Sequence, residues 1–248
     1  MPTLRDEFLK CTYYKITTNA LTKSGEYKSG ELYVTLMLDE DDNQSLEFKD
    51  KLGQVLLTRQ INGSEKYDTY YVYDDFGNLR YVLPPMAIDK VTKYTDSDPV
   101  MKQYAYIYRY DHRNRCTWKQ LPGADPIVYV YDKADQLIFT QDGEQRTRGE
   151  WTFSIPDAFG RIVLAGISKD TISVKNKVVK GVYNPGGEYK RYNILLNGEI
   201  GKFKNTPMIL SVNFYDNYDF RGMAEIPLAP TAFTKDATVT GDIQTGNS

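Results

Sequence analysis

The sequence predicts an all-β fold in which consecutive antiparallel β-hairpins lie side by side and form a curved sheet. Tyrosine is unusually frequent, at 21 of 248 residues, and its apolar ring and polar hydroxyl suit the half-buried surface of a sheet. The tyrosines also alternate along the chain, as in residues 71–73, 106–110 and 129–131, which places each set on one face of a strand. A recurring turn motif is the third observation, and helical periodicity is nearly absent.

The turn motif follows each tyrosine-rich strand. An Asp, two further residues and a small turn-forming residue lead into a second strand. The clearest copies are YVYDDFGNLRYV (71–82), YRYDHRNRCTW (108–118) and YVYDKADQLIFT (129–140). Weaker copies are EFKDKLGQVLL (47–57), SIPDAFGRIVLAG (154–166) and NFYDNYDFRG (213–222). Six copies in one chain form an internal repeat.

The residue types in the motif fit the geometry of a tight turn. The Asp side chain can accept a hydrogen bond from a backbone N–H two residues further on, and it is found at Asp50, Asp74, Asp111, Asp132, Asp157 and Asp216. The fourth position requires a left-handed backbone, which Gly, Asn and Asp tolerate best. It is occupied by Gly53, Gly77, Asn114, Asp135, Gly160 and Asp219. We therefore predict that these twelve residues form turns and have a structural role.

Taken in order, residues 1–29 are expected to be a partly irregular segment, and residues 30–166 the repeat hairpins. Strands at 25–38 and 45–49 flank an acidic turn at 39–43. Prolines break the pattern at 83–100, which predicts a loop, and residues 5–12 and 85–93 are short helical candidates. Residues 167–210 are expected to be an inserted β elaboration, with strands at 171–174, 178–183, 189–196 and 201–203 and turns at 184–187 and 197–198. Residues 211–226 are predicted to be the final repeat hairpin, and residues 227–248 an extended or disordered tail.

Composition argues against several classes of protein. The 31 Lys and Arg residues are balanced by 33 Asp and Glu residues and are spread along the chain, so we expect no nucleic-acid partner. Apolar runs are too short for membrane insertion, and charge near the N-terminus argues against a signal peptide. One histidine cannot build a two-histidine metal site, and no nucleotide-binding or nucleophile motif occurs. We predict no metal, no cofactor and no catalytic residues.

Two local features leave room for other chemistry. The run from Asp39 to Asn43 partly matches a calcium-binding EF-hand loop, but Gln44 stands where the loop requires glycine. A solvated hairpin tip is the better interpretation. Cys11 and Cys116 are too few to form a disulfide framework, and whether they pair stays open.

The repeat resembles the YD repeat of Rhs-family proteins, in which aromatic, x, aromatic, Asp, x, x, Gly precedes an apolar strand. The copies at 71–82, 108–118 and 129–140 are the nearest matches, and residues 30–60 look like the segment upstream of such repeats. The resemblance covers roughly residues 30–222. It implies a segment of a YD-repeat shell within a larger exported or cell-surface protein, which in bacterial members often encloses a C-terminal toxin. The family's self-cleavage motif is missing, because Asp98-Pro99 and Asp125-Pro126 continue into Val and Ile.

The resemblance therefore implies a non-catalytic structural scaffold. Its partners would be the remainder of the parent chain and, through open sheet edges, other copies of itself. A carbohydrate-binding or adhesion module is the alternative, because exposed aromatic rings form stacking platforms. The candidate ligand-binding residues are Tyr106, Tyr108, Tyr110, Trp118, Tyr129 and Tyr131. Aromatic pairs also stabilise sheets without any ligand, by about 0.5 to 1.5 kcal/mol each.

Overall fold

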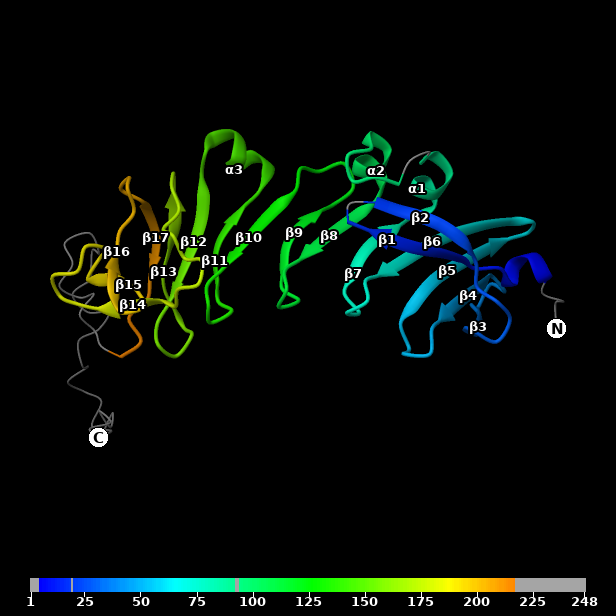
Figure 1. The fold of residues 1–248 in the computed structure, drawn as a ribbon, viewed down its shortest axis with the longest axis horizontal. Helices are drawn as coiled ribbons and strands as arrows, with labels where there is room; N and C mark the ends of the chain where they lie inside the picture. Colours follow the sequence, from blue (N-terminus) through cyan, green and yellow to red (C-terminus); the bar gives the residue numbers. More distant parts are fainter. Residues whose placement is uncertain (1–4, 19, 92–93, 217–248) are drawn as a thin grey trace, which may run out of the picture.

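The computed structural model describes residues 5–18, 20–91 and 94–216. Its main feature is an open antiparallel sheet of 12 strands in the order β17-β13-β12-β11-β10-β9-β8-β7-β6-β5-β4-β3. From β4 to β13 each strand lies beside the strand that precedes it in the sequence, so the hairpins form one long row (Figure 1). The predicted all-β fold class is confirmed.

The strands of the main sheet are short, as expected for a row of hairpins. They are β3 (Tyr33–Leu38), β4 (Gln44–Lys49), β5 (Val55–Asn62), β6 (Glu65–Tyr73), β7 (Leu79–Leu83), β8 (Tyr106–Tyr110), β9 (Cys116–Gln120), β10 (Ile127–Tyr131), β11 (Leu137–Gln141), β12 (Trp151–Pro156), β13 (Ile162–Ser168) and β17 (Met208–Val212).

The two faces of the main sheet differ in burial, because side chains alternate along each strand. Pairs such as Tyr81 with Ile107 and Phe139 with Phe153 lie on one face and are fully buried. We call this the covered face. The opposite face, which we call the open face, carries the alternating tyrosines, and these are only half-buried.

Two hydrophobic clusters lie on the covered face. The first extends from β4 to β9 and packs against β1 (Thr12–Thr17), β2 (Ala20–Glu26), the 3-10 helix η1 (Asp6–Leu9) and two helices. The second extends from β10 to β17 and packs against β14 (Val179–Tyr183) and β15 (Tyr192–Leu196), which form a small sheet with β16 (Glu199–Gly201). The border falls between β9, where Trp118 joins the first cluster, and β10, where Val130 joins the second.

The N-terminal segment is more regular than the sequence indicated. β1 and β2 pair as an antiparallel hairpin, which buries Tyr14 and Leu21 beneath it. The strand predicted at 25–38 is divided in the structure. Residues 25–26 end β2, residues 27–32 form a link, and residues 33–38 form β3. The sequence pattern was weak here because few residues of this hairpin are buried.

The loop predicted at 83–100 contains the helix α1 (Pro85–Lys90), which falls on the helical candidate at 85–93, and the start of a second helix, α2 (Pro99–Tyr104). A proline breaks a strand, but it suits the first helical turn, where its missing N–H is not needed. Asp98 caps α2 by accepting from the backbone N–H of Val100 and Met101. A third helix, α3 (Gly143–Arg148), begins with a capping box formed by Asp142 and Gln145. No helix in the described part of the chain is long and apolar enough to cross a membrane.

The predicted insertion forms a separate three-stranded sheet, β14-β15-β16. The turn that joins β15 to β16 contains Asn197 and Gly198, and both residues have a positive φ. Residues 171–174 are not a strand, although Ile172 and Val174 are buried. β17 starts at residue 208, inside the range assigned to the insertion, and pairs with β13. Asp219 and the predicted tail at 227–248 lie outside the described residues.

Candidate functional site

Five turns of the same design, which we call corners, join successive strands of the main sheet, and all five lie at the same end of the strands. In the corner at Asp74, Oδ1 accepts from the backbone N–H of Phe76 at 3.1 Å and of Asn78 at 2.9 Å. Gly77 N donates to Asp74 O, and Asp74 N donates to Asn78 O, both at 2.9 Å. The corners at Asp50, Asp111, Asp132 and Asp157 repeat these four contacts. The aspartate thus satisfies two N–H groups that no strand partner reaches.

The fourth position of each corner has the left-handed backbone that the sequence pattern indicated. The φ angles are +82° at Gly53, +81° at Gly77, +59° at Asn114, +64° at Asp135 and +84° at Gly160. This conformation is costly for most L-residues. Ten of the twelve predicted turn residues therefore lie in complete corners of this design. Asp216 is described only as an ion-pair partner of Arg161.

The acidic turn predicted at 39–43 is a further corner of this design, although the six copies of the motif did not include it. Asp39 Oδ1 accepts from Asp41 N at 3.0 Å and Asn43 N at 2.8 Å, and Asp42 has a φ of +61°. This corner joins β3 to β4 at the other end of the strands from the five corners above. The spacing of Asp39 and Asp42 matches the Asp, x, x, Asp form of the motif, but no pair of tyrosines precedes it.

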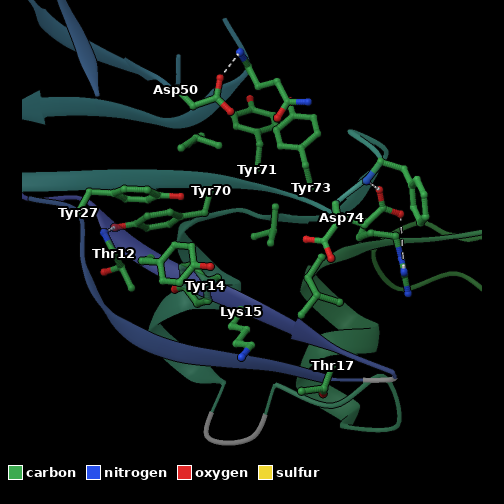
Figure 2. Close-up of a pocket in the computed structure, with 18 of the residues that line it drawn as sticks. Thr12, Tyr14, Lys15, Thr17, Tyr27, Asp50, Tyr70, Tyr71, Tyr73 and Asp74 are labelled. Atoms are coloured by element: carbon green, nitrogen blue, oxygen red, sulfur yellow. Dashed lines mark hydrogen bonds and ion pairs between the residues drawn. The ribbon is translucent and has the colours of Figure 1, made fainter. Parts of the chain in front are cut away.

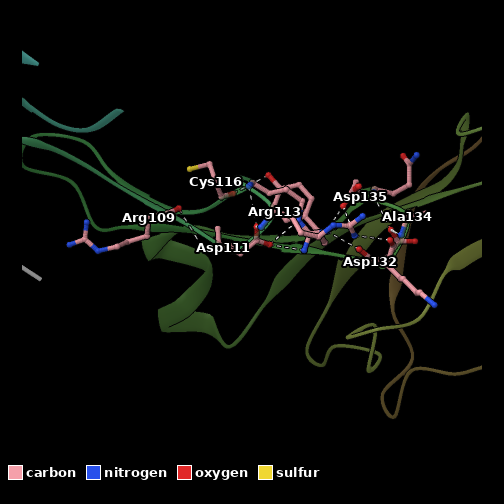
Figure 3. Close-up of polar contacts among 12 residues, drawn as sticks. Arg109, Asp111, Arg113, Cys116, Asp132, Ala134 and Asp135 are labelled. Carbon is pink, nitrogen blue, oxygen red and sulfur yellow. Dashed lines mark hydrogen bonds and ion pairs between the residues drawn. The ribbon is translucent and has the colours of Figure 1, made fainter. Parts of the chain in front are cut away.

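In two corners the residue after the fourth position donates a hydrogen bond to the fourth residue of the next corner. Asn78 Nδ2 donates to Asn114 Oδ1 at 3.0 Å, and Arg115 Nη1 donates to Asp135 Oδ1 at 2.8 Å. Figure 3 shows Asp111, Asp132 and Asp135 of the second pair of corners. Arg161 Nη2 lies 2.8 Å from Asp216 Oδ2. Side-chain hydrogen bonds, which we call the polar ladder, therefore join the three consecutive corners at Asp74, Asp111 and Asp132 and help to hold these hairpins in register.

Where the next corner has glycine, the linking residue is glutamine. Gln54 Nε2 lies 3.1 Å from the point where a Cβ on Gly77 would stand, and Gln136 Nε2 lies 3.7 Å from the corresponding point on Gly160. The amide thus occupies the space that the missing side chain leaves. Side-chain acceptors at Asn114 and Asp135 meet donors instead.

Arginine side chains lower the pKa of two of the corner carboxylates. At Asp111 burial favours the neutral acid, but hydrogen bonds from Arg115 and from two backbone N–H groups outweigh it and lower the pKa. At Asp157 the same balance, with Arg161 as the donor, also lowers the pKa. Asp132 contributes differently, because its Oδ2 accepts from Val179 N at 2.9 Å and ties the corner to β14.

The open face brings five of the six candidate ligand-binding residues together. Tyr108 pairs with Lys119, which pairs with Ile127, and this register places Tyr106, Tyr108, Tyr110, Tyr129 and Tyr131 on that face. Trp118 does not join them. It pairs with Arg109 and Val128 on the covered face and packs against the first hydrophobic cluster.

Several of these tyrosines already have partners within the sheet. Tyr110 donates to Leu79 O and Tyr131 to Cys116 O, both at 3.0 Å, and Arg115 lies 4.9 Å above the Tyr131 ring. Burial, with the neighbouring Cys116 second, raises the pKa of Tyr110 to about 12. These contacts have a structural role, and they leave the ring of each half-buried tyrosine partly open to solvent.

A cleft of about 610 Å³ lies between β1 and the corner at Asp74. Figure 2 shows Lys15 and Thr17 of β1 on one side of β6, and Tyr71 and Tyr73 on the other. The lining is rich in hydroxyl groups and carries charges of both signs, including Lys15 and Asp74. It suits a polar, hydrogen-bonding ligand. Within the described ranges, no three His, Cys, Asp or Glu side chains gather as a metal site would require.

No family model and no curated protein matches the chain. Among solved structures, the crystal structure of TcdB2-TccC3-TEV is similar with a TM-score of 0.39 and 13% identity, covering 57% of this chain and 7% of that one. The crystal structure of TcdB2-TccC3 is similar with a TM-score of 0.40 and 12% identity, covering 69% and 8%. The chain spans less than a tenth of the length of either.

Proposed function

We propose that the chain is a non-catalytic scaffold, a strip of YD-type hairpins that forms part of a larger exported or cell-surface protein of the Rhs type. Its partner in that role is the remainder of the parent chain. The single observation that carries the proposal is the corner ladder. Five corners repeat one hydrogen-bond pattern, and side-chain hydrogen bonds join the corner at Asp74 to that at Asp111 and the corner at Asp111 to that at Asp132.

Such repetition suits mechanical continuity better than catalysis. In a repeat protein each unit contacts mainly its neighbours, so stability accumulates along the row. An active site instead depends on dissimilar groups that converge at one place. The repeated design of the corners, with Asp at the first position and Gly, Asn or Asp at the fourth, uses its charged groups to close turns.

The native product tests this proposal. An antibody raised against the chain is used to blot cytosolic, surface and culture-medium fractions of the cells that carry the gene. The expected result is a polypeptide much larger than 28.5 kDa, at the surface or in the medium. A product of 28.5 kDa confined to the cytosol would overturn it.

A glycan-binding module is the second candidate, supported by the tyrosine row on the open face. Tyr108 and Tyr129 lie there beside Lys119, and aromatic rings with neighbouring polar groups suit sugar stacking. A glycan array probed with the purified chain is the test. Binding that Tyr108→Ala abolishes, while Tyr67→Ala on β6 leaves it unchanged, would support this role. No binding across the array would remove it.

A further inference from the structure

The first strand of the main sheet, β3, has the features of an interface. All six of its residues are exposed, and none of them is charged. Val34 and Leu36 are each 42% exposed, although the residues paired with them, Phe48 and Leu46, are at most 1% exposed. The apolar layer of the covered face therefore reaches β3 and stops with its last row uncovered.

The backbone of β3 is open at the same residues. Asp39 N donates to Asn43 O at the end of the β3–β4 hairpin. Bonded and non-bonded pairs alternate in an antiparallel ladder, so the N–H and C=O groups of Val34, Leu36 and Leu38 point away from β4. Within the described part of the chain, β4 is the one neighbour of β3. Three residues thus offer both backbone groups and apolar side chains to an incoming strand.

The strand that precedes β3 in the sequence does not fill this edge. Residues 27–32 lead from β2 to β3, but β2 pairs with β1, and that hairpin packs over the covered face. An edge strand that is uncharged, apolar and six residues long is a template for pairing with another chain. The β3 strand of a second copy has the same length and the same alternation of apolar side chains.

We propose that β3 pairs with the β3 strand of a second copy of this chain, antiparallel, about a two-fold axis between the two Leu36 residues. Rotation about an axis normal to the sheet keeps the covered face on one side in both copies. Leu36 then lies opposite Leu36, and Val34 opposite Leu38. This register uses all the outward backbone groups and joins the two apolar layers into one.

Charge favours the antiparallel direction. The turn after Leu38 carries four acidic residues, from Asp39 to Asp42. The other end of β3 lies near a group of both charges, in which the exposed Lys28 and Lys51 stand with Glu31 and Asp50. Antiparallel pairing brings each acidic turn beside this mixed group of the partner copy. Parallel pairing would place the two acidic turns side by side.

The opposite edge supplies a matched control. Leu210 of β17 is 62% exposed and β17 pairs with β13 among the described strands. Molar mass is measured by light scattering during size-exclusion chromatography, over a dilution series, for the natural chain, Leu36→Lys, Leu36→Glu and Leu210→Lys. Amide exchange of β6 and β12 checks that each variant is folded.

The natural chain and Leu210→Lys are expected at twice the 28.5 kDa of one chain, and the two Leu36 variants at 28.5 kDa each. A mixture of Leu36→Lys and Leu36→Glu should recover the dimer, because the two-fold axis brings the opposite charges together. Amide exchange of β3 should slow as the dimer forms. A monomeric natural chain would overturn the proposal, as would loss of the dimer in Leu210→Lys, which would indicate head-to-tail pairing of β3 with β17.

Discussion

Arg59 and Asp68 form a buried, bidentate ion pair across β5 and β6. Arg59 Nε lies 2.6 Å from Asp68 Oδ1, and Nη2 lies 2.6 Å from Oδ2. The remaining nitrogen, Nη1, donates to Phe8 O at 2.7 Å and to Lys10 O at 2.9 Å. Burial alone would lower the pKa of Arg59, but the hydrogen bonds and charge of Asp68 raise it. One guanidinium group therefore anchors the N-terminal segment to the sheet.

Asp68→Asn should destabilise the chain by about 3 to 5 kcal/mol, because it leaves the charge of Arg59 buried without a counter-ion. Urea unfolding at neutral pH measures the change. The double variant Arg59→Met with Asp68→Leu is the control and should lose less, since no charge remains buried. A single variant as stable as the natural chain would contradict the importance of the pair.

Gly77→Val should cost about 1 to 2 kcal/mol from the left-handed backbone alone, and more if Gln54 Nε2 cannot move away. Gly77→Asn is the matched control, because Asn114 already occupies this position in another corner. It should be clearly less destabilising than valine. Thermal unfolding of both variants gives the comparison, and equal melting temperatures would count against the turn geometry.

Asp74→Ala should cost roughly 1 kcal/mol through the lost turn hydrogen bonds to Phe76 N and Asn78 N. The adjacent Asp75 is exposed, so Asp75→Ala controls for the loss of one negative charge. Urea unfolding should separate the two variants. If both lose the same stability, the effect lies in net charge and not in the corner.

Arg115→Met should reduce the dependence of stability on acid pH. The folded-state pKa of Asp111 lies below its ordinary value of 3.8, so its pairing stabilises the fold above that pH. This contribution is lost as the pH falls through the folded-state pKa. Chemical unfolding from pH 7 down to pH 2 should show a shallower acid loss in the variant, and NMR titration should show the pKa of Asp111 raised. An unchanged pKa would contradict the assigned cause.

Cys11 should resist alkylation in the folded chain. Burial, only partly opposed by the positive charge of Arg59, raises its pKa to about 12, so almost no thiolate forms at pH 8. Cys116 is only half-buried and should react first with iodoacetamide. Peptide mass spectrometry after timed labelling measures both rates. The structure has both thiols free, and a disulfide-linked peptide would contradict it.

The sequence predicted the parts of the fold that depend on local chemistry. The corner at Asp111 could be found because its turn needs particular residues at particular positions, whereas the corner at Asp39 lacked the flanking tyrosines. The helix at Pro85 falls on a helical candidate of the sequence, whereas α2 at Pro99 was not anticipated, because proline starts a helix as readily as it ends a strand. The face of Trp118 depended on the strand register, and the contact of Arg59 with Phe8 joins residues far apart in the sequence. Neither has a local signature.

We expect the row of hairpins to bend most easily at the border between the two hydrophobic clusters. β9 and β10 meet through a short register of Lys119 with Ile127 and Trp118 with Val128, and neither cluster extends across that seam. We expect bending strain to concentrate there, while the blocks on either side stay stiff. The row of hairpins can then change its curvature between β9 and β10 while both hydrophobic clusters stay packed.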